Sequence, residues 1–167
     1  MKHLPIFLLL FLTYQLQAQN PFPMDSASNK VQYQQIISVK SATIPQLRQK
    51  AKDWLTTQTK SAIRLDEANL LMATLIHKYV ERPESAQSMQ VNLYVPLALE
   101  FKDGQYTYTI TNLKASSAMT GQTNQQWDLE NIANDFLPKE DLKGAQGIDK
   151  AIRQDIIERL KMAMAAK

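Results

Sequence analysis

Hydrophobic and polar residues alternate along several stretches of the chain, which is typical of strands with one buried face. Between Val31 and Val39 one face is mostly apolar and the other is mostly polar, with Ile36 on the polar side. The same period of two recurs in four further stretches, at residues 62–65, 70–80, 89–102 and 106–110. The alternation therefore predicts five strands.

Apolar residues at helical spacing predict three helices. Thr43 and Gln46 have capping-box spacing at the start of the first helix, which extends to Gln58. A short helix is expected at residues 128–136, and a long C-terminal helix at about residues 148–166. The apolar stripe of that last helix consists of Ile148, Ile152, Ile156 and Leu160. The predicted order is thus strand, helix, four strands and then helices.

The dipeptide Asp103-Gly104 lies between two alternating runs and predicts a two-residue type I′ turn. The turn and the hydrophobic pattern give the same register, so the flanking strands are expected to form a hairpin. The opposed pairs are then Phe101 with Tyr106, Leu99 with Tyr108 and Leu97 with Ile110 on one face, and Glu100 with Thr107 and Ala98 with Thr109 on the other.

Pro96 interrupts this hairpin, because its place opposite Thr111 in the ladder requires an N–H group that proline lacks. We expect the pairing to stop or bulge at Pro96. The segment at residues 89–95 should then pair mainly with the preceding strand.

Three connections are rich in turn-forming residues. The first is Asp66–Asn69, a predicted hairpin turn in which Asn69 best tolerates a left-handed backbone. Residues 114–126 are small and polar and predict a loop. Gly144 and Gly147 predict another loop before the last helix.

The N-terminus has the three parts of a secretory signal. Lys2 is positively charged, residues 4–12 are almost entirely apolar, and Ala18 is a small residue at the expected cleavage point. The apolar run is shorter than the ~20 residues that span a bilayer, so an uncleaved anchor is the less favoured alternative. The sequence predicts a signal peptide at residues 1–18, a flexible lead at residues 19–30, and one domain at residues 31–167.

Composition narrows the classes of function. The chain has no cysteine, which excludes disulfides, thiol catalysis and an N-terminal lipid anchor. Its net charge of +3 falls by one when Lys2 leaves with the signal. Charges of both signs are interspersed, unlike the clustered basic patch of a nucleic-acid-binding protein. We therefore expect a soluble exported protein, periplasmic or secreted, that binds no nucleic acid and is not stably inserted in a membrane.

The order of elements resembles the TATA-binding-protein-like (TBP-like) fold, with the pattern β-α-β4-α. More specifically, the chain is similar to a family of exported bacterial proteins known as a domain of unknown function with a TBP-like fold. The matching segments are the signal, residues 31–39, residues 48–60 with Ala51-Lys52-Asp53-Trp54, and residues 102–108. The resemblance implies an α+β domain with a five-stranded antiparallel sheet, long helices on one face, and here an extra short helix before the C-terminal helix. Asn69 replaces a family glycine, and Thr107 replaces a family arginine between two tyrosines.

Candidate catalytic and metal-binding residues are few. His77 is the only histidine after the signal, and a lone histidine is more often structural. A metal site needs several ligands at fixed spacing, and no cofactor motif occurs, so neither a metal nor a cofactor is expected. The adjacent acids Asp66-Glu67 and Glu140-Asp141 suit turns better than a facing catalytic pair. Tyr106 and Tyr108 could form an aromatic platform, but packing beneath the helices is the favoured interpretation.

An antiparallel sheet with helices on one side exposes its other side, and this face is the predicted binding surface. Its candidate residues are Glu100, Gln105, Thr107 and Thr109. The favoured hypothesis is a non-enzymatic module of the cell envelope that binds an unknown protein, peptide or glycan through this face, a strand edge or the loop at residues 114–126. One alternative is a metal-independent hydrolase or carbohydrate-processing enzyme that uses Glu100 or another acid. The other alternative is a self-assembling structural subunit.

Overall fold

The chain is described from a computed structural model, which covers residues 20–58, 60–81, 89–117, 126–134 and 139–166. The predicted signal at residues 1–18 lies outside these ranges. The strands are β1 (Met24–Asp25), β2 (Lys30–Ser38), β3 (Ser61–Asp66), β4 (Leu70–Glu81), β5 (Met89–Lys102), β6 (Gln105–Thr111), β7 (Lys114–Ser117) and β8 (Gln126–Asp128). The helical elements are α2 (Ile44–Thr57), α3 (Leu129–Asn134), α4 (Lys139–Ala151), the π-helical segment η2 (Ile152–Glu158) and α5 (Arg159–Ala165).

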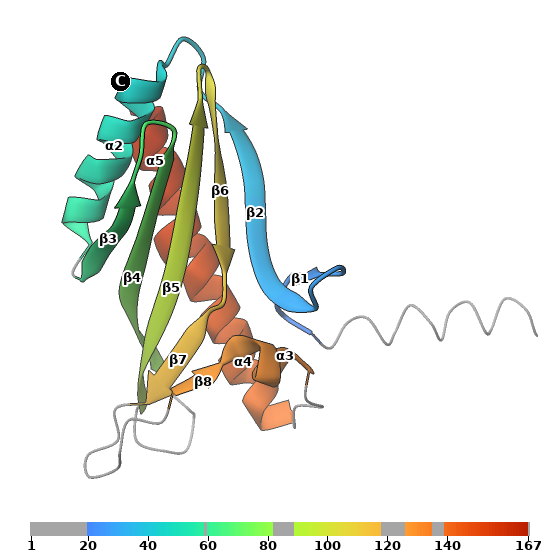
Figure 1. The fold of residues 1–167 in the computed structure, drawn as a ribbon. Helices are drawn as coiled ribbons and strands as arrows, with labels where there is room; N and C mark the ends of the chain where they lie inside the picture. Colours follow the sequence, from blue (N-terminus) through green and yellow to red (C-terminus); the bar gives the residue numbers. More distant parts are fainter. Residues whose placement is uncertain (1–19, 59, 82–88, 118–125, 135–138, 167) are drawn as a thin grey trace, which may run out of the picture.

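The five long strands form an antiparallel sheet in the order β2-β6-β5-β4-β3. Helix α2 and the C-terminal helix cover one face of this sheet, and the opposite face carries no helix (Figure 1). The predicted α+β, TBP-like architecture is therefore confirmed. The strand count differs, because the short strands β1, β7 and β8 raise the sheet to eight strands.

The core lies between the sheet and the two long helices. Helix α2 begins after the predicted capping box, in which the Thr43 N–H donates to Gln46 Oε1 at 2.9 Å. Its buried residues are Leu47, Ala51, Trp54 and Leu55. The strands contribute every second residue, so that Leu97, Leu99 and Phe101 of β5 are at most 2% exposed. Each such large side chain adds roughly 1.5–3 kcal/mol of stability through burial.

The β5–β6 hairpin has the predicted register, from Lys102 opposite Gln105 to Leu97 opposite Ile110. The predicted type I′ turn is wrong, because that turn needs a positive φ at both central residues and only Gly104 has one, at 78°. Contacts with the segment before α2 set the turn instead. The Ile44 N–H donates to Asp103 Oδ1 at 2.9 Å, and the Gly104 N–H donates to the Ala42 carbonyl at 2.8 Å. The β3–β4 hairpin also forms as predicted, although Asn69 is not left-handed.

Pairing between β5 and β6 ends at Leu97, next to Pro96, as predicted. Residues 89–100 pair with β4, but β7 also pairs with β5, from Tyr94 opposite Lys114 to Val91 opposite Ser117. The register shifts by one residue between β6 and β7, and Asn112 absorbs the extra residue with a φ of 54°. Because a one-residue shift exchanges the faces of a strand, buried positions change from even to odd numbers and include Leu113.

Three segments that were predicted to lack regular secondary structure contain strands or a helix. In the expected flexible lead, β1 pairs with β2 and Phe22 is only 4% exposed. The expected loop at residues 114–126 begins with β7 and ends at the first residue of β8, and residues 118–125 lie outside the described ranges. The expected loop around Gly144 and Gly147 is helix α4. A Cβ atom at Gly147 would overlap the Tyr79 hydroxyl, so glycine there permits close packing of helix on sheet.

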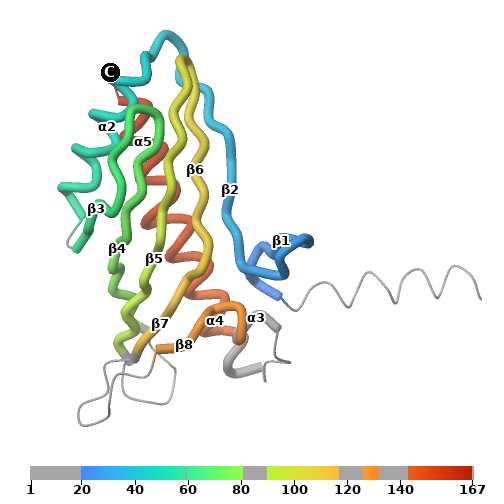
Figure 2. Tube along the Cα trace, in the orientation of Figure 1, coloured from blue at the N-terminus to red at the C-terminus, as the bar shows by residue number. Residues whose placement is uncertain are grey.

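The C-terminal helix is continuous through α4, η2 and α5 (Figure 2). Its buried residues include one at every fourth position, namely Ile148, Ile152, Ile156, Leu160 and Met164. Because an α-helix has 3.6 residues per turn, a four-residue repeat would drift by about 40° at each step. The wider turns of η2 reduce this drift, which keeps the apolar stripe facing the sheet.

Candidate functional site

The predicted binding residues all lie on the outer face of the sheet, the face without helices. Cross-strand pairing places Glu100 opposite Thr107, Gln105 opposite Lys102, and Thr109 opposite Ala98. Glu100 is exposed and the other three predicted residues are half-buried. The structure thus brings Glu100, Gln105, Thr107 and Thr109 together on one surface.

The outer face has two halves of different chemistry. The half over β2 and β6 is mainly polar, although Ile36 there is 63% exposed. The half over β3, β4 and β5 mixes apolar and polar positions. The polar half consists of Gln32, Gln34, Ser38, Gln105, Thr107, Thr109 and Thr111. The apolar positions of the mixed half are Leu65, Leu70, Met72, Ile76, Val80, Tyr94, Pro96 and Ala98, and its polar positions include Thr74, Lys78, Asn92, Glu100 and Lys102.

The residues directly opposite Glu100 do not supply the second acid that glycoside hydrolysis needs. The residues directly opposite Glu100 are Leu70 on β4 and Thr107 on β6. A catalytic pair requires two carboxyl groups about 5–9.5 Å apart on either side of the scissile bond. Neither cross-strand neighbour is a carboxylic acid, so the directly paired strands present Glu100 as a single surface carboxylate.

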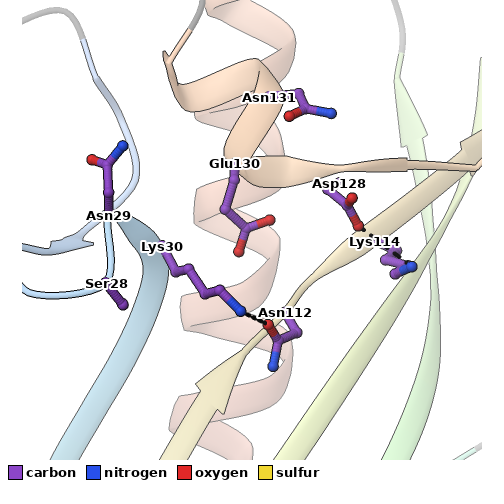
Figure 3. A pocket seen from close by; sticks show the side chains of 8 residues that line it. All are labelled: Ser28, Asn29, Lys30, Asn112, Lys114, Asp128, Glu130 and Asn131. Carbon is purple, nitrogen blue, oxygen red and sulfur yellow. Dashed lines mark hydrogen bonds and ion pairs between the residues drawn. The ribbon is translucent and has the colours of Figure 1, made fainter.

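A polar pocket of about 580 Å³ lies at the end of the sheet near β1, β8 and α3 (Figure 3). Three segments far apart in sequence form it: the β1–β2 turn, the β6–β7 junction with β7, and the β8–α3 junction. Asn29 and Asn112 have left-handed backbones at the first two of these segments, with φ of 53° and 54°. The lining residues are Ser28, Asn29, Lys30, Asn112, Lys114, Asp128, Glu130 and Asn131.

Two of the four charged groups in this pocket neutralise each other. Lys114 Nζ lies 3.5 Å from Asp128 Oδ1, whereas Lys30 Nζ donates to the neutral Asn112 Oδ1 at 2.7 Å. Glu130 extends toward the same space as Lys30 (Figure 3). Glu130 Oε1 is inaccessible to solvent, and no described residue gives it a hydrogen bond. A carboxylate and an ammonium group therefore face the pocket without an ion pair between them in the described part of the chain.

Sequence reasoning missed this pocket. Only its paired asparagines at turn positions could have indicated it, since asparagine is the non-glycine residue that most readily adopts a left-handed backbone. The hydrogen bond from Lys30 to Asn112 joins residues 82 positions apart. Asn112 could not be recognised as a turn residue from the sequence, because its left-handed backbone belongs to the one-residue register shift between β6 and β7.

His77, Tyr106 and Tyr108 lie in surroundings typical of residues that stabilise the fold. His77 Nε2 lies 3.5 Å from Asp155 Oδ2 of the C-terminal helix. Burial lowers the pKa of His77, and the nearby Asp155 carboxylate opposes part of this effect. Tyr106 is fully buried and Tyr108 is 5% exposed, which confirms the prediction that they pack beneath the helices. Burial raises the pKa of both hydroxyl groups.

Two further properties concern the described ranges alone. Within them, no three His, Cys, Asp or Glu side chains gather closely enough to hold a metal ion. No helix in the same ranges combines the length and apolar character needed to cross a membrane.

Residues 33–116 match the family described as a domain of unknown function (DUF4468) with TBP-like fold. The chain belongs to this family. The matched segment runs from within β2 to within β7, so it contains helix α2 and the five long strands except for the first residues of β2. The resemblance predicted from residues 31–39, 48–60 and 102–108 is therefore confirmed. No curated protein matches the sequence.

Two crystal structures share the fold of this DUF4468 protein. A TBP-like protein from Parabacteroides distasonis ATCC 8503 has a TM-score of 0.64 and 13% identity, covering 86% of this chain and 97% of that chain. A DUF4468 family protein from Bacteroides ovatus ATCC 8483 has a TM-score of 0.65 and 12% identity, covering 88% of this chain and 92% of that chain. At such low identity the likeness concerns the fold alone.

Proposed function

We propose that this DUF4468 protein is a non-enzymatic binding module of the cell envelope that holds a neutral, hydroxyl-rich glycan in the polar pocket. The observation that carries the proposal is the pair of facing, mutually unpaired charges, Lys30 and Glu130. The N-terminal signal pattern supports export to the compartment where such glycans are found.

The ligand class follows from the hydrogen-bonding chemistry of the pocket. Glu130 only accepts hydrogen bonds when ionised, and Lys30 only donates them. A hydroxyl group can do both, so neighbouring hydroxyls of one sugar can bond to Lys30 and to Oε2, the carboxylate oxygen of Glu130 that is not buried, at once. Three asparagine amides add donors and acceptors in fixed positions, and the two lysines balance the two carboxylates. The pocket thus favours a neutral ligand over a strongly charged one.

The size of the pocket supports the same conclusion. A volume of about 580 Å³ lies within the ~300–1,000 Å³ typical of small-molecule sites. Every lining residue has a polar side chain, which suits a sugar better than a purely apolar ligand. The two acids of the pocket suit binding better than acid–base catalysis by a carboxylate pair. Asp128 is paired with Lys114, so Glu130 is the single unpaired carboxylate of the lining.

The proposal is tested by NMR titration of the protein recovered from the cell envelope. The probes are neutral oligosaccharides containing N-acetylglucosamine, with uncharged tripeptides as the comparison. We expect saturable shifts of the asparagine side-chain amides of the pocket with the oligosaccharides. Glu130→Gln should weaken binding about tenfold, since it replaces hydrogen bonds to a charged group by neutral ones. Glu67→Gln, an exposed acid in the β3–β4 turn, is the matched control and should leave binding unchanged.

Three results would contradict the proposal. Tripeptide binding without oligosaccharide binding would assign the pocket to peptides. Release of sugar products during the titration would favour the hydrolase alternative instead. Recovery of the protein solely from the cytoplasmic fraction would remove the cell-envelope part of the proposal.

A further inference from the structure

Strand β4 extends past its neighbour β3 at one edge of the sheet. Pairing with β3 covers β4 from Leu71 to Leu75, and the Ile76 N–H donates to the Lys60 carbonyl at 2.9 Å. Beyond that point β4 continues to Glu81, paired with β5 on one side. No described strand pairs with its other side there, and Figures 1 and 2 show no element beside it. Residues 77–81 are called the open edge below.

The backbone of the open edge presents unpaired hydrogen-bonding groups. In an antiparallel strand the N–H and C=O groups of alternate residues point to the same side. Because the Ile76 N–H points toward β3, the N–H and C=O groups of Lys78 and Val80 point to the open side. Such a row of unpaired groups is a template for one more strand.

Two hollows meet at Ile76, where the open edge begins. One of about 340 Å³, on the outer face over β3 and the paired part of β4, is lined by Lys60, Ser61, Ala62, Arg64, Thr74, Ile76 and Tyr94. The other, of about 150 Å³, is lined by Gln58, Leu75, Ile76, His77, Lys78 and Ile156. Side chains of an added strand alternate between the two faces, so the residues of an extended peptide nearest Ile76 can reach both hollows.

Positive charges lie in the open edge and next to it. Lys78 within it, Lys60 just before β3 and Arg64 in β3 are exposed, and none of them has an acidic partner within 4.0 Å in the described ranges. These three cations outnumber Glu81, the acid at the far end of the open edge. Like charges repel, so the same edge of a second copy is an unfavourable occupant. From the unpaired backbone, the paired hollows and this charge, we infer that the open edge binds an extended acidic segment of a partner polypeptide as an added strand. This site is separate from the glycan pocket and does not depend on it.

The test uses a labelled hexapeptide, acetylated and amidated, in which valine alternates with Asp or Glu. Fluorescence anisotropy measures its affinity for the protein, and NMR locates it. We expect shifts at the Lys78 and Val80 amides and an affinity that falls with added salt, since the charged groups are exposed. The same peptide with Lys in place of its acids should bind at least tenfold more weakly.

Variants on each partner separate the backbone and charge contributions. Val80→Pro removes one outward N–H without touching the β5 ladder and should weaken binding about three- to tenfold, the value of one hydrogen bond. Val80→Thr keeps the N–H and is the matched control. Lys78→Glu should weaken binding of the acidic peptide, whereas Lys102→Glu, an exposed lysine far from the open edge, should not. Peptides N-methylated at alternate residues test the backbone bonds without altering the protein.

The outcomes are decisive in either direction. Equal binding of acidic and lysine peptides, or of methylated and unmethylated peptides, overturns strand addition at this edge. Dimers joined through the open edge, seen as concentration-dependent loss of the Lys78 and Val80 signals, would replace the partner by a second copy. Peptide binding that persists in Glu130→Gln would show that this site stands even where glycan binding is lost.

Discussion

The two faces of one sheet differ in burial in this protein, although they alternate residue by residue along the same strands. On the inner face, Leu99 contacts a core closed by two long helices and is 1% exposed. Its neighbour Glu100 points to the outer face and is exposed. The comparison teaches that the period of two separates residues that stabilise the core from residues that contact solvent, so that residues on the outer face can change without loss of the fold.

The largest difference between the two faces is expected when the adjacent residues Leu99 and Glu100 are each truncated to alanine and the free energy of unfolding is measured. Leu99→Ala should lower the free energy of unfolding by about 2–5 kcal/mol, because it leaves a cavity between Leu71 and Tyr108. Glu100→Ala should change it by no more than about 0.5 kcal/mol. Urea denaturation measures both values. Similar losses for the two variants would show that the outer face is also part of the stabilising core.

A smaller effect is expected where the hairpin turn meets the inner-face helix. Asp103→Ala removes the acceptor for the Ile44 N–H at the start of α2 and should cost about 1 kcal/mol. Asp103→Asn retains an oxygen acceptor and should recover most of the loss. Hydrogen exchange at the Ile44 amide provides the residue-level readout. Unchanged exchange in Asp103→Ala would mean that the turn does not hold the helix.

The smallest predicted effect is a pH dependence at the inner face. Burial lowers the pKa of His77 from the usual value of 6.5, so the unfolded chain takes up a proton at a higher pH than the folded chain. This contribution to stability is present above pH 6.5 and is lost as the pH falls through that value toward the lower folded pKa. As the pH is lowered from about 8 to 5, the midpoint temperature of thermal unfolding should therefore fall less steeply for His77→Gln than for the unaltered protein. A steeper fall in the variant would indicate that Asp155 dominates over burial.

Local signals were sufficient to predict the five long strands of the sheet but not the short strands β1, β7 and β8. The alternation on both sides of Asp103-Gly104 and the missing N–H of Pro96 determine the β5–β6 register and its end, because both depend on residues close in sequence. The turn type was not predictable from the dipeptide, since it depends on a hydrogen bond from Ile44. Gly147 is helical in spite of its low propensity because tertiary contact with Tyr79 overrides local preference.

The binding sites were less predictable than the fold. The outer-face residues Glu100 and Thr107 could be placed from alternation alone, although alternation assigns them no ligand. The polar pocket depends on the left-handed Asn112 and on the approach of Lys30, and neither leaves a pattern with a fixed spacing. The open edge of β4 depends on the unequal lengths of two paired strands.

The π-helical segment η2 has a consequence for how far one helix can follow the sheet. With regular α-helical turns throughout, the residues at every fourth position would rotate steadily around the helix axis. The wider turns of η2 let one uninterrupted helix keep its apolar stripe on the inner face from the strand ends near α3 to its contact with α2. A few hydrogen bonds of unusual span thus spare the chain a break between two shorter helices on this side of the sheet.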